Sequence, residues 1–110
     1  MKIAIPITNN KLSPHFGHCE TFSIFTVANN QIVEETSVVP PPHEPGSHPR
    51  FLKEQGCSVI IAGGMGNRAQ DLFHESGIQT IIGAPDLPPE ELVNIFLQDD
   101  LESGDNLCDH

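Results

Sequence analysis

The sequence predicts a single α/β domain in which a mixed β-sheet carries helices on its faces. The chain has 110 residues, a length that suits one domain with a modest core that folds without metals or disulfides. Its first half holds three short apolar runs rich in β-branched residues, which are typical of strands. Its second half alternates apolar runs with segments of helical periodicity. The expected element order is therefore β-β-β-α-β-α-β-α, with five strands and three helices.

The first strand is expected over residues 2–8, where apolar and β-branched side chains predominate. Pro6 cannot donate a hydrogen bond to a neighbouring strand, so it predicts a sheet edge or a local irregularity. Residues 9–19 are rich in turn-forming residues and contain Pro and Gly. We therefore expect a loop there.

A hairpin is expected next, formed by strands at 21–28 and 31–39. The Asn29-Asn30 pair between them favours a tight turn. Residues 40–49 contain five prolines, which exclude a regular element. Ser47 is expected to cap the helix that follows this proline-rich loop.

The remaining elements alternate and are bounded by glycines. Gly56 and Gly77 are expected to end two helices, because glycine readily adopts the left-handed conformation that terminates them. The expected elements are a helix beginning near Pro49, a strand over 57–64, a helix over 66–76, a strand over 78–84 and a helix over 87–101. One domain over residues 1–104 and a flexible C-terminal tail at 105–110 follow from this pattern.

The charge distribution argues against nucleic acid as a partner. The chain carries five basic and fifteen acidic residues, for a formal charge of −10, whereas a protein that binds a phosphate backbone needs a basic patch. Ten of the fifteen acidic residues follow position 68, where the last basic residue lies. We interpret this acidic C-terminal third as a solvated face or, alternatively, as a docking face for a basic partner.

Neither membrane insertion nor secretion is expected. No apolar run approaches the roughly 20 residues that cross a membrane, and the first residues lack the apolar core and cleavage site of a signal peptide. A cytoplasmic protein is therefore expected. The three cysteines make a disulfide framework improbable, so each thiol is interpreted as buried, reactive or metal-binding.

Candidate metal ligands gather in three segments outside the expected helices and strands. Thiolate and imidazole are the ligands that zinc, copper(I) and metal–sulfide clusters prefer. The candidates lie in SPHFGHC, in the proline-rich loop and in the tail, and are His15, His18, Cys19, His43, His48, Cys108 and His110. A shared site requires these segments to meet at one end of the sheet, which the sequence leaves open. The alternative is that they are unconnected surface residues.

Two further residues of these types are interpreted as structural. Cys57 begins an apolar strand and is expected to be a core thiol. His74 is expected on the exposed side of its helix. No nucleophile elbow and no cluster of carboxylates appears along the chain, so an enzyme is not expected.

A glycine-rich turn forms the second candidate feature. The segment AGGMGNRA, residues 62–69, leads from a strand through a turn into a helix. Backbone N–H groups in such a turn, together with a helix N-terminus, can hold an anion. The expected cradle consists of Gly63, Gly64, Met65, Gly66 and Arg68, with Arg68 supplying positive charge. The alternative is that the glycines only permit a tight turn, and the segment lacks the Gly-Lys-Ser/Thr of a P-loop.

These segments together resemble the dinitrogenase iron–molybdenum cofactor biosynthesis family, which includes NifX-like carriers and the C-terminal region of NifB. The resemblance rests on IAIPIT…PHFG, the HEPG loop, IIAGGMGNRAQDLF, GIQTIIGA and the terminal CDH, which span essentially the whole chain. It implies a three-layer α/β/α, ribonuclease H-like fold with a five-stranded mixed sheet. It does not imply nuclease activity, because KIAIPIT lacks the acidic residue that such chemistry needs.

The resemblance also implies a non-catalytic role in binding or carrying a metal–sulfur cofactor or its precursor. Such a cluster contains molybdenum, iron or copper, and zinc is a further possibility raised by the donor types. His15 would contact the cofactor together with the glycine-rich turn. A P-loop ATPase of the cluster-carrier type is an implied partner. The alternative function is a regulatory or adaptor module that binds such a protein and holds no stoichiometric metal.

Overall fold

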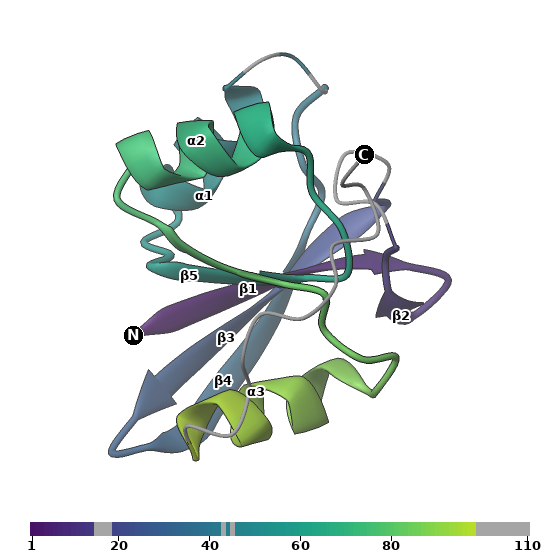
Figure 1. Ribbon diagram of the computed structural model, residues 1–110. Helices are drawn as coiled ribbons and strands as arrows, with labels where there is room; N and C mark the ends of the chain where they lie inside the picture. Colours follow the sequence, from purple (N-terminus) through teal and green to yellow (C-terminus); the bar gives the residue numbers. More distant parts are fainter. Residues whose placement is uncertain (15–18, 43, 45, 99–110) are drawn as a thin grey trace.

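The protein is a mixed α/β structure in which one sheet separates two layers of helices (Figure 1). The computed structural model describes residues 1–14, 19–42, 44 and 46–98. Its elements are β1 (Lys2–Thr8), β2 (Lys11–Leu12), β3 (Thr21–Ala28), β4 (Gln31–Val38), α1 (Ser47–Glu54), β5 (Val59–Ala62), α2 (Asn67–Glu75), β6 (Gln79–Ile82) and α3 (Pro89–Leu97). The five longer strands and the three helices match the expected order. The sheet nevertheless has six strands, because β2 adds a short strand within the expected loop at 9–19.

The strands follow the order β4-β3-β1-β5-β6, with β2 paired to β1 beside this path. β1 is parallel to β5 and β5 to β6, whereas β3 is antiparallel to both β1 and β4. It follows that β1, β4, β5 and β6 all run in one direction. Their carboxyl ends lie at the same edge of the sheet, which we refer to as the carboxyl edge.

The short strand β2 arises from a second asparagine pair. Asn9 and Asn10 have φ values of 54° and 64°, and Asn29 and Asn30 have φ values of 53° and 63°. Both pairs therefore adopt the left-handed conformation that a tight hairpin turn requires and that asparagine tolerates. The turn expected at Asn29-Asn30 is confirmed, and the equivalent turn at Asn9-Asn10 returns the chain alongside β1.

Pro6 lies in a central strand and not at a sheet edge, so of the two expected explanations the local irregularity is the one found. β1 pairs with β5 only at Ile3 and Ala4, and beyond them the two strands no longer pair. The Pro6 carbonyl accepts a hydrogen bond from Ser13 N at 2.8 Å. Because the N and O atoms of one strand residue face the same side, the missing Pro6 donor also faces this side and not β3. The proline therefore costs the sheet no hydrogen bond to β3.

The two faces of the sheet carry separate hydrophobic cores. Leu52 of α1 and Phe73 of α2 pack with Phe22 and Ile60 on one face. Leu92 and Val93 of α3 pack on the other face, in a cluster that includes side chains of β1, β3 and β5. Alternation along each strand sends successive apolar side chains to opposite faces, which is why these strands are apolar throughout. The expected arrangement of helices on both faces is confirmed, and the ribonuclease H-like label stays a prediction.

The N-terminus of α1 differs from expectation, whereas its C-terminus does not. Gly46, with φ 80°, precedes the helix, and no side chain caps it, so the predicted Ser47 cap is wrong. Instead the Ser47 hydroxyl donates to carbonyl groups of the proline-rich loop, including Glu44 O at 2.9 Å, and accepts from Glu44 N at 3.0 Å. At the other terminus the chain turns at Gly56, whose φ of 87° favours glycine.

Two structural interpretations of reactive residues are confirmed. Cys57 is buried in the core on the face covered by α1 and α2. His74 is exposed on α2 and its ring Nε2 lies 3.0 Å from the Thr80 hydroxyl of β6. Across the described ranges, no helix has both the length and the apolar character needed to span a membrane.

Candidate functional site

The carboxyl edge brings together segments that are far apart in the sequence. The chain leaves β4, β5 and β6 at this edge, and it enters β3 there. The connections concerned are residues 13–20, 39–46, 63–66 and 83–88. The described parts of the first candidate segment and of the proline-rich loop therefore begin or end at the same end of the sheet as the glycine-rich turn.

The first connection is fixed to β1 at both flanks. Ser13 N donates to Pro6 O at 2.8 Å, on the side of β1 that faces β5 and β2. Glu20 N donates to Ile7 O at 2.8 Å, where β3 begins. The described flanks of this connection, Ser13 and Glu20, therefore bind opposite sides of β1 near its carboxyl end.

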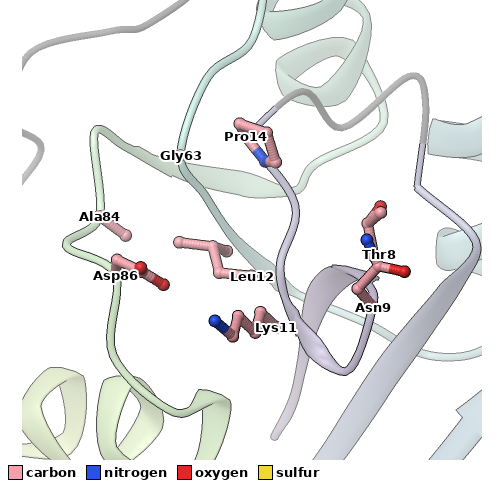
Figure 2. Close-up of a pocket in the computed structure, with 8 residues that line it drawn as sticks. All are labelled: Thr8, Asn9, Lys11, Leu12, Pro14, Gly63, Ala84 and Asp86. Atoms are coloured by element: carbon pink, nitrogen blue, oxygen red, sulfur yellow. The ribbon is translucent and has the colours of Figure 1, made fainter.

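A pocket opens where β1 and β5 separate. Its volume is about 540 Å³, and its lining residues are Thr8, Asn9, Lys11, Leu12, Pro14, Gly63, Ala84 and Asp86. Figure 2 shows Lys11 and Leu12 extending from β2 toward Ala84 and Asp86 on the opposite wall. The volume of this pocket falls in the range of typical small-molecule sites, about 300–1,000 Å³.

The topology explains why the pocket lies at this place. From β1 the chain continues to β2 and then β3, whereas from β5 it continues through α2 to β6 on the other side. Connections that leave neighbouring parallel strands in opposite directions create a crevice outside their carboxyl ends, where α/β proteins commonly bind ligands. β2 occupies the side of β1 from which β5 has withdrawn, so the pocket lies between the β1–β2 hairpin and the segments after β5 and β6.

The glycine-rich turn is anchored in the core at one residue. Met65 is fully buried beside Phe73 of α2, and its carbonyl accepts a hydrogen bond from Gln70 Nε2 at 3.0 Å. Gly63 lines the pocket, and its carbonyl accepts from Gly83 N at 3.2 Å. The predicted turn is thus held in place from both sides, next to a pocket.

The exposed part of the same turn leads into α2. Gly63, Gly64 and Met65 are buried, while Gly66 and Arg68 are exposed. No side chain caps the N-terminus of α2 at Gly66. Uncapped N–H groups at a helix N-terminus attract negative charge, so this part of the predicted cradle has the polarity that an anion requires.

Cys19 lies at the carboxyl edge with a half-buried thiol. It packs against the core beneath α1 and α2. Burial raises the pKa of this thiol to about 11, and backbone hydrogen bonds at Cys19 and Ile7 offset only part of the increase. The thiol is therefore protonated at neutral pH, and a metal that binds it must displace the proton.

His48 is positioned as a structural residue. Its side chain is 3% exposed, and its ring meets Phe22 edge-on with centroids 5.5 Å apart. Its Nε2 lies 3.3 Å from Pro41 O, which ties α1 to the proline-rich loop. This environment favours a role in packing, and ligation by His48 stays a prediction.

The other predicted ligands cannot be placed. His15, His18, His43, Cys108 and His110 lie outside the described residues, as does the predicted tail at 105–110. Over residues 1–14, 19–42, 44 and 46–98, no group of three or more His, Cys, Asp and Glu side chains is placed to hold a metal ion.

Of the eight residues that line the pocket, sequence reasoning singled out only Gly63, and those it missed include Thr8, Lys11 and Asp86. The Thr8 hydroxyl is buried and has no hydrogen-bond partner among the described residues. The signal for the hairpin that carries Lys11 was the Asn9-Asn10 pair, which repeats the pair recognised at Asn29-Asn30. Asp86 follows the carboxyl end of β6, a position at which polar residues often serve ligands.

Comparison with known proteins identifies relatives along almost the full chain. A family model described as dinitrogenase iron-molybdenum cofactor matches residues 1–99. The chain is 33% identical over 108 residues to the uncharacterized protein MJ0580 of Methanocaldococcus jannaschii, covering 93% of this chain and 90% of that protein.

Solved structures share the fold at lower sequence identity. The crystal structure of PH0822 matches with a TM-score of 0.86 and 24% identity, covering 97% of this chain and 99% of that one. The apo form of the orange protein (ORP) from Desulfovibrio gigas matches with a TM-score of 0.78 and 19% identity, covering 96% and 93% of the two chains. At these identities the likeness establishes a common fold.

Proposed function

Since the chain belongs to the dinitrogenase iron–molybdenum cofactor family, we propose that it holds a metal–sulfur cofactor or its precursor and passes it on without chemical turnover. The cluster is cargo, so it must bind and also leave. Its metal would be molybdenum, iron or copper, in keeping with the thiol and imidazole donors in the sequence.

One observation carries this proposal. Cys19, the described parts of the proline-rich loop and the glycine-rich turn lie at the carboxyl edge, where the 540 Å³ pocket opens between β1 and β5. One soft donor, Cys19, therefore shares an end of the sheet with backbone suited to an anion. Sulfide clusters need both, because they are bound by soft donors and often carry negative charge.

The described residues fit such a cargo in part. The uncapped α2 N-terminus and Arg68 supply positive potential, and Lys11 supplies a cation at the pocket. Cys19 supplies one thiol, in a protonated state that favours reversible over permanent ligation. The remaining predicted donors lie outside the described residues.

A P-loop ATPase as the partner that loads or receives the cargo stays part of the proposal. The acidic surface after position 68 is the feature that would meet a basic partner. The cytoplasm is the proposed location.

The proposal is tested by anaerobic reconstitution of the full chain. Protein is incubated with tetrathiomolybdate and copper(I), or separately with ferrous iron and sulfide, then desalted and analysed for Mo, Cu, Fe and Zn. We expect stoichiometric retention of metal and visible charge-transfer absorbance. Cys19→Ala should reduce both strongly, and combining it with Cys108→Ala should abolish them.

Cys57→Ala is the matched control, because Cys57 has a similarly raised pKa of about 11 but lies in the core near the opposite edge. It should retain the cluster as the unmodified chain does. Equal loss in the Cys19 and Cys57 variants, or no metal retained by the unmodified chain, contradicts the proposal.

A further inference from the structure

A second cavity lies on the other side of the Asn9-Asn10 turn, between the β3–β4 hairpin and the start of α3. Its volume is about 380 Å³. The residues that line it are Ile7, Asn10, Thr21, Ser23, Glu35, Ser37, Pro88, Pro89 and Glu90. We refer to it as the α3 groove. It shares no lining residue with the pocket between β1 and β5.

Most residues that line the α3 groove carry side-chain oxygen atoms, and they come from β3, β4, α3 and the Asn9-Asn10 turn. β3 and β4 contribute the hydroxyl groups of Thr21, Ser23 and Ser37, and the turn contributes the Asn10 amide. Carboxylates come from Glu35 on β4 and Glu90 on α3. Among the residues that the structure describes, the lining contains no lysine, arginine, histidine or cysteine, so these residues offer hard oxygen donors without a competing cation or soft donor.

The strand register places several of these groups together on one face. Ser23 lies directly opposite Ser37, and Glu35 lies opposite Phe25, which belongs to the core under α3. Cβ atoms of directly opposed residues are separated by about 4.5–5.5 Å. Glu35 and Ser37 are two positions apart and so share a face of the sheet. The Glu90 carboxylate approaches from the first turn of α3.

Ser23 points to a ligand independently of the acidic residues. Its side chain is 8% exposed, and its hydroxyl forms no hydrogen bond with any part of the chain that the structure describes. The hydroxyl oxygen is not fully enclosed, unlike that of Thr8, and so remains accessible from the groove. Because this hydroxyl lines the groove, a bound group there would satisfy it.

We propose that the α3 groove binds one hard divalent cation, Mg²⁺ or Ca²⁺, between Glu35 and Glu90, with Ser23 as an additional oxygen donor. Hard cations bind carboxylate, hydroxyl and carbonyl oxygens and retain water where protein ligands are few. Two carboxylates match the charge of one divalent ion. The bound ion would link β4 to the N-terminus of α3, two elements that already pack together.

The test is titration of the full chain, freed of metal with a chelator, at an ionic strength fixed by KCl. Calorimetry with MgCl₂ and CaCl₂ should show one saturable site, with a Kd of about 10⁻⁴–10⁻³ M for a site of low ligand charge. Glu35→Gln and Glu90→Gln should each weaken binding by about tenfold or more, because affinity follows the number of charged ligands. The thermal midpoint should rise with cation in the unmodified chain only.

Two neighbouring glutamates provide matched controls. Glu34→Gln changes the preceding residue of β4, which lines a different cavity with Lys2 and Thr26. Glu91→Gln removes the other first-turn charge of α3 and so matches the helix-dipole effect of Glu90→Gln. Both variants should bind the cation as the unmodified chain does. Circular dichroism of every variant without cation checks that each one is folded.

Ser23→Ala distinguishes a ligand site from general screening of negative charge. It should weaken binding severalfold without lowering stability in the absence of cation, because the hydroxyl has no partner to lose. Equal weakening by all four glutamate substitutions would indicate screening and overturn the proposal. Binding that survives both Glu35→Gln and Glu90→Gln would place the ion elsewhere, and the absence of a saturable site would also refute it.

Discussion

The two edges of the sheet are built differently. At the carboxyl edge the β1–β2 turn contains two residues and the other four connections contain four to eight, and several of these segments line the pocket or the α3 groove. At the opposite edge the connections contain two to four residues. There Gly56 and Gly77 have positive φ, and short hydrogen bonds close the turns, such as Ile78 N to Phe73 O at 2.9 Å.

The terminus of the chain reinforces the opposite edge. The N-terminal amine donates to Val27 O at 3.2 Å, and Lys2 Nζ donates to Gln55 O at 3.2 Å. These bonds tie the N-terminus to the end of β3 and to the end of α1. The difference indicates that the opposite edge mainly stabilises the fold, while the carboxyl edge leaves loops and cavities available for ligands. The following substitutions test this division.

The largest effect is expected at Met65, where the carboxyl edge is itself anchored in the core. Met65→Ala removes a fully buried side chain and should lower the free energy of unfolding by about 2–5 kcal/mol. Urea denaturation measures this change. Val39→Ala, at a side chain that is 76% exposed, should leave stability unaltered. A small loss for Met65→Ala would mean that the glycine-rich turn is not held by the core.

The next effect concerns the pH dependence of metal binding at Cys19. Because its pKa is raised to about 11, bound metal must displace a proton throughout the range from pH 7 to 9. Apparent affinity should therefore rise with pH by about tenfold per unit for this one thiol. In Cys19→Ser the slope of log affinity against pH should fall by about one. An unchanged slope would exclude Cys19 as a ligand.

Substitutions of two glycines that border open space test stability and cluster retention separately. An added Cβ would meet no atom within 4 Å at Gly66 or at Gly77, but only Gly77 has a positive φ, of 78°. Gly77→Ala, at the opposite edge, should cost about 1–2 kcal/mol and leave cluster retention intact. Gly66→Ala, at the N-cap of α2, should cost at most about 1 kcal/mol but reduce cluster retention if the turn contacts the cargo. Denaturation and metal analysis of both variants decide between these outcomes.

The smallest effect distinguishes the two asparagine turns. Glycine accepts the positive φ of either turn, so Asn10→Gly should be nearly neutral for stability. Asn30→Gly also removes a hydrogen bond from Asn30 Nδ2 to Leu97 O, at 3.3 Å on an exposed surface, and should cost about 0.5 kcal/mol. Thermal unfolding compares the two. A larger loss for Asn10→Gly would show that this side chain has a structural partner in the folded protein.

The element order was predictable because each long strand and helix carries its own periodic pattern. The burial of Cys57 and the turn at Asn29-Asn30 could likewise be predicted from the local sequence. β2 was not predicted, because a strand of two residues is too short to show periodicity. The fit of Pro6 in a central strand depended on where β5 stops pairing, which is a property of tertiary structure.

The candidate site was predictable in its residue types and not in its arrangement. Soft donors and a glycine-rich turn are visible in the sequence, but which edge of the sheet each segment reaches depends on strand direction. The His48 imidazole is a possible metal ligand by residue type, but in the fold it packs against Phe22 and lies next to the Pro41 carbonyl. Lys11 and Asp86 come from separate connections, so no local pattern joins them.

The Asn9-Asn10 turn separates two cavities, since Asn9 lines the pocket and Asn10 lines the α3 groove. The segment after β6 is shared in the same way, with Asp86 on one side and Pro88 on the other. A ligand that shifts this thin partition in one cavity reshapes the other. Any coupling is reciprocal, so occupancy of the groove would alter the affinity for cargo by the same factor as cargo alters occupancy of the groove. The Asn9-Asn10 turn would thus couple occupancy of the groove to the loading and release of the cargo.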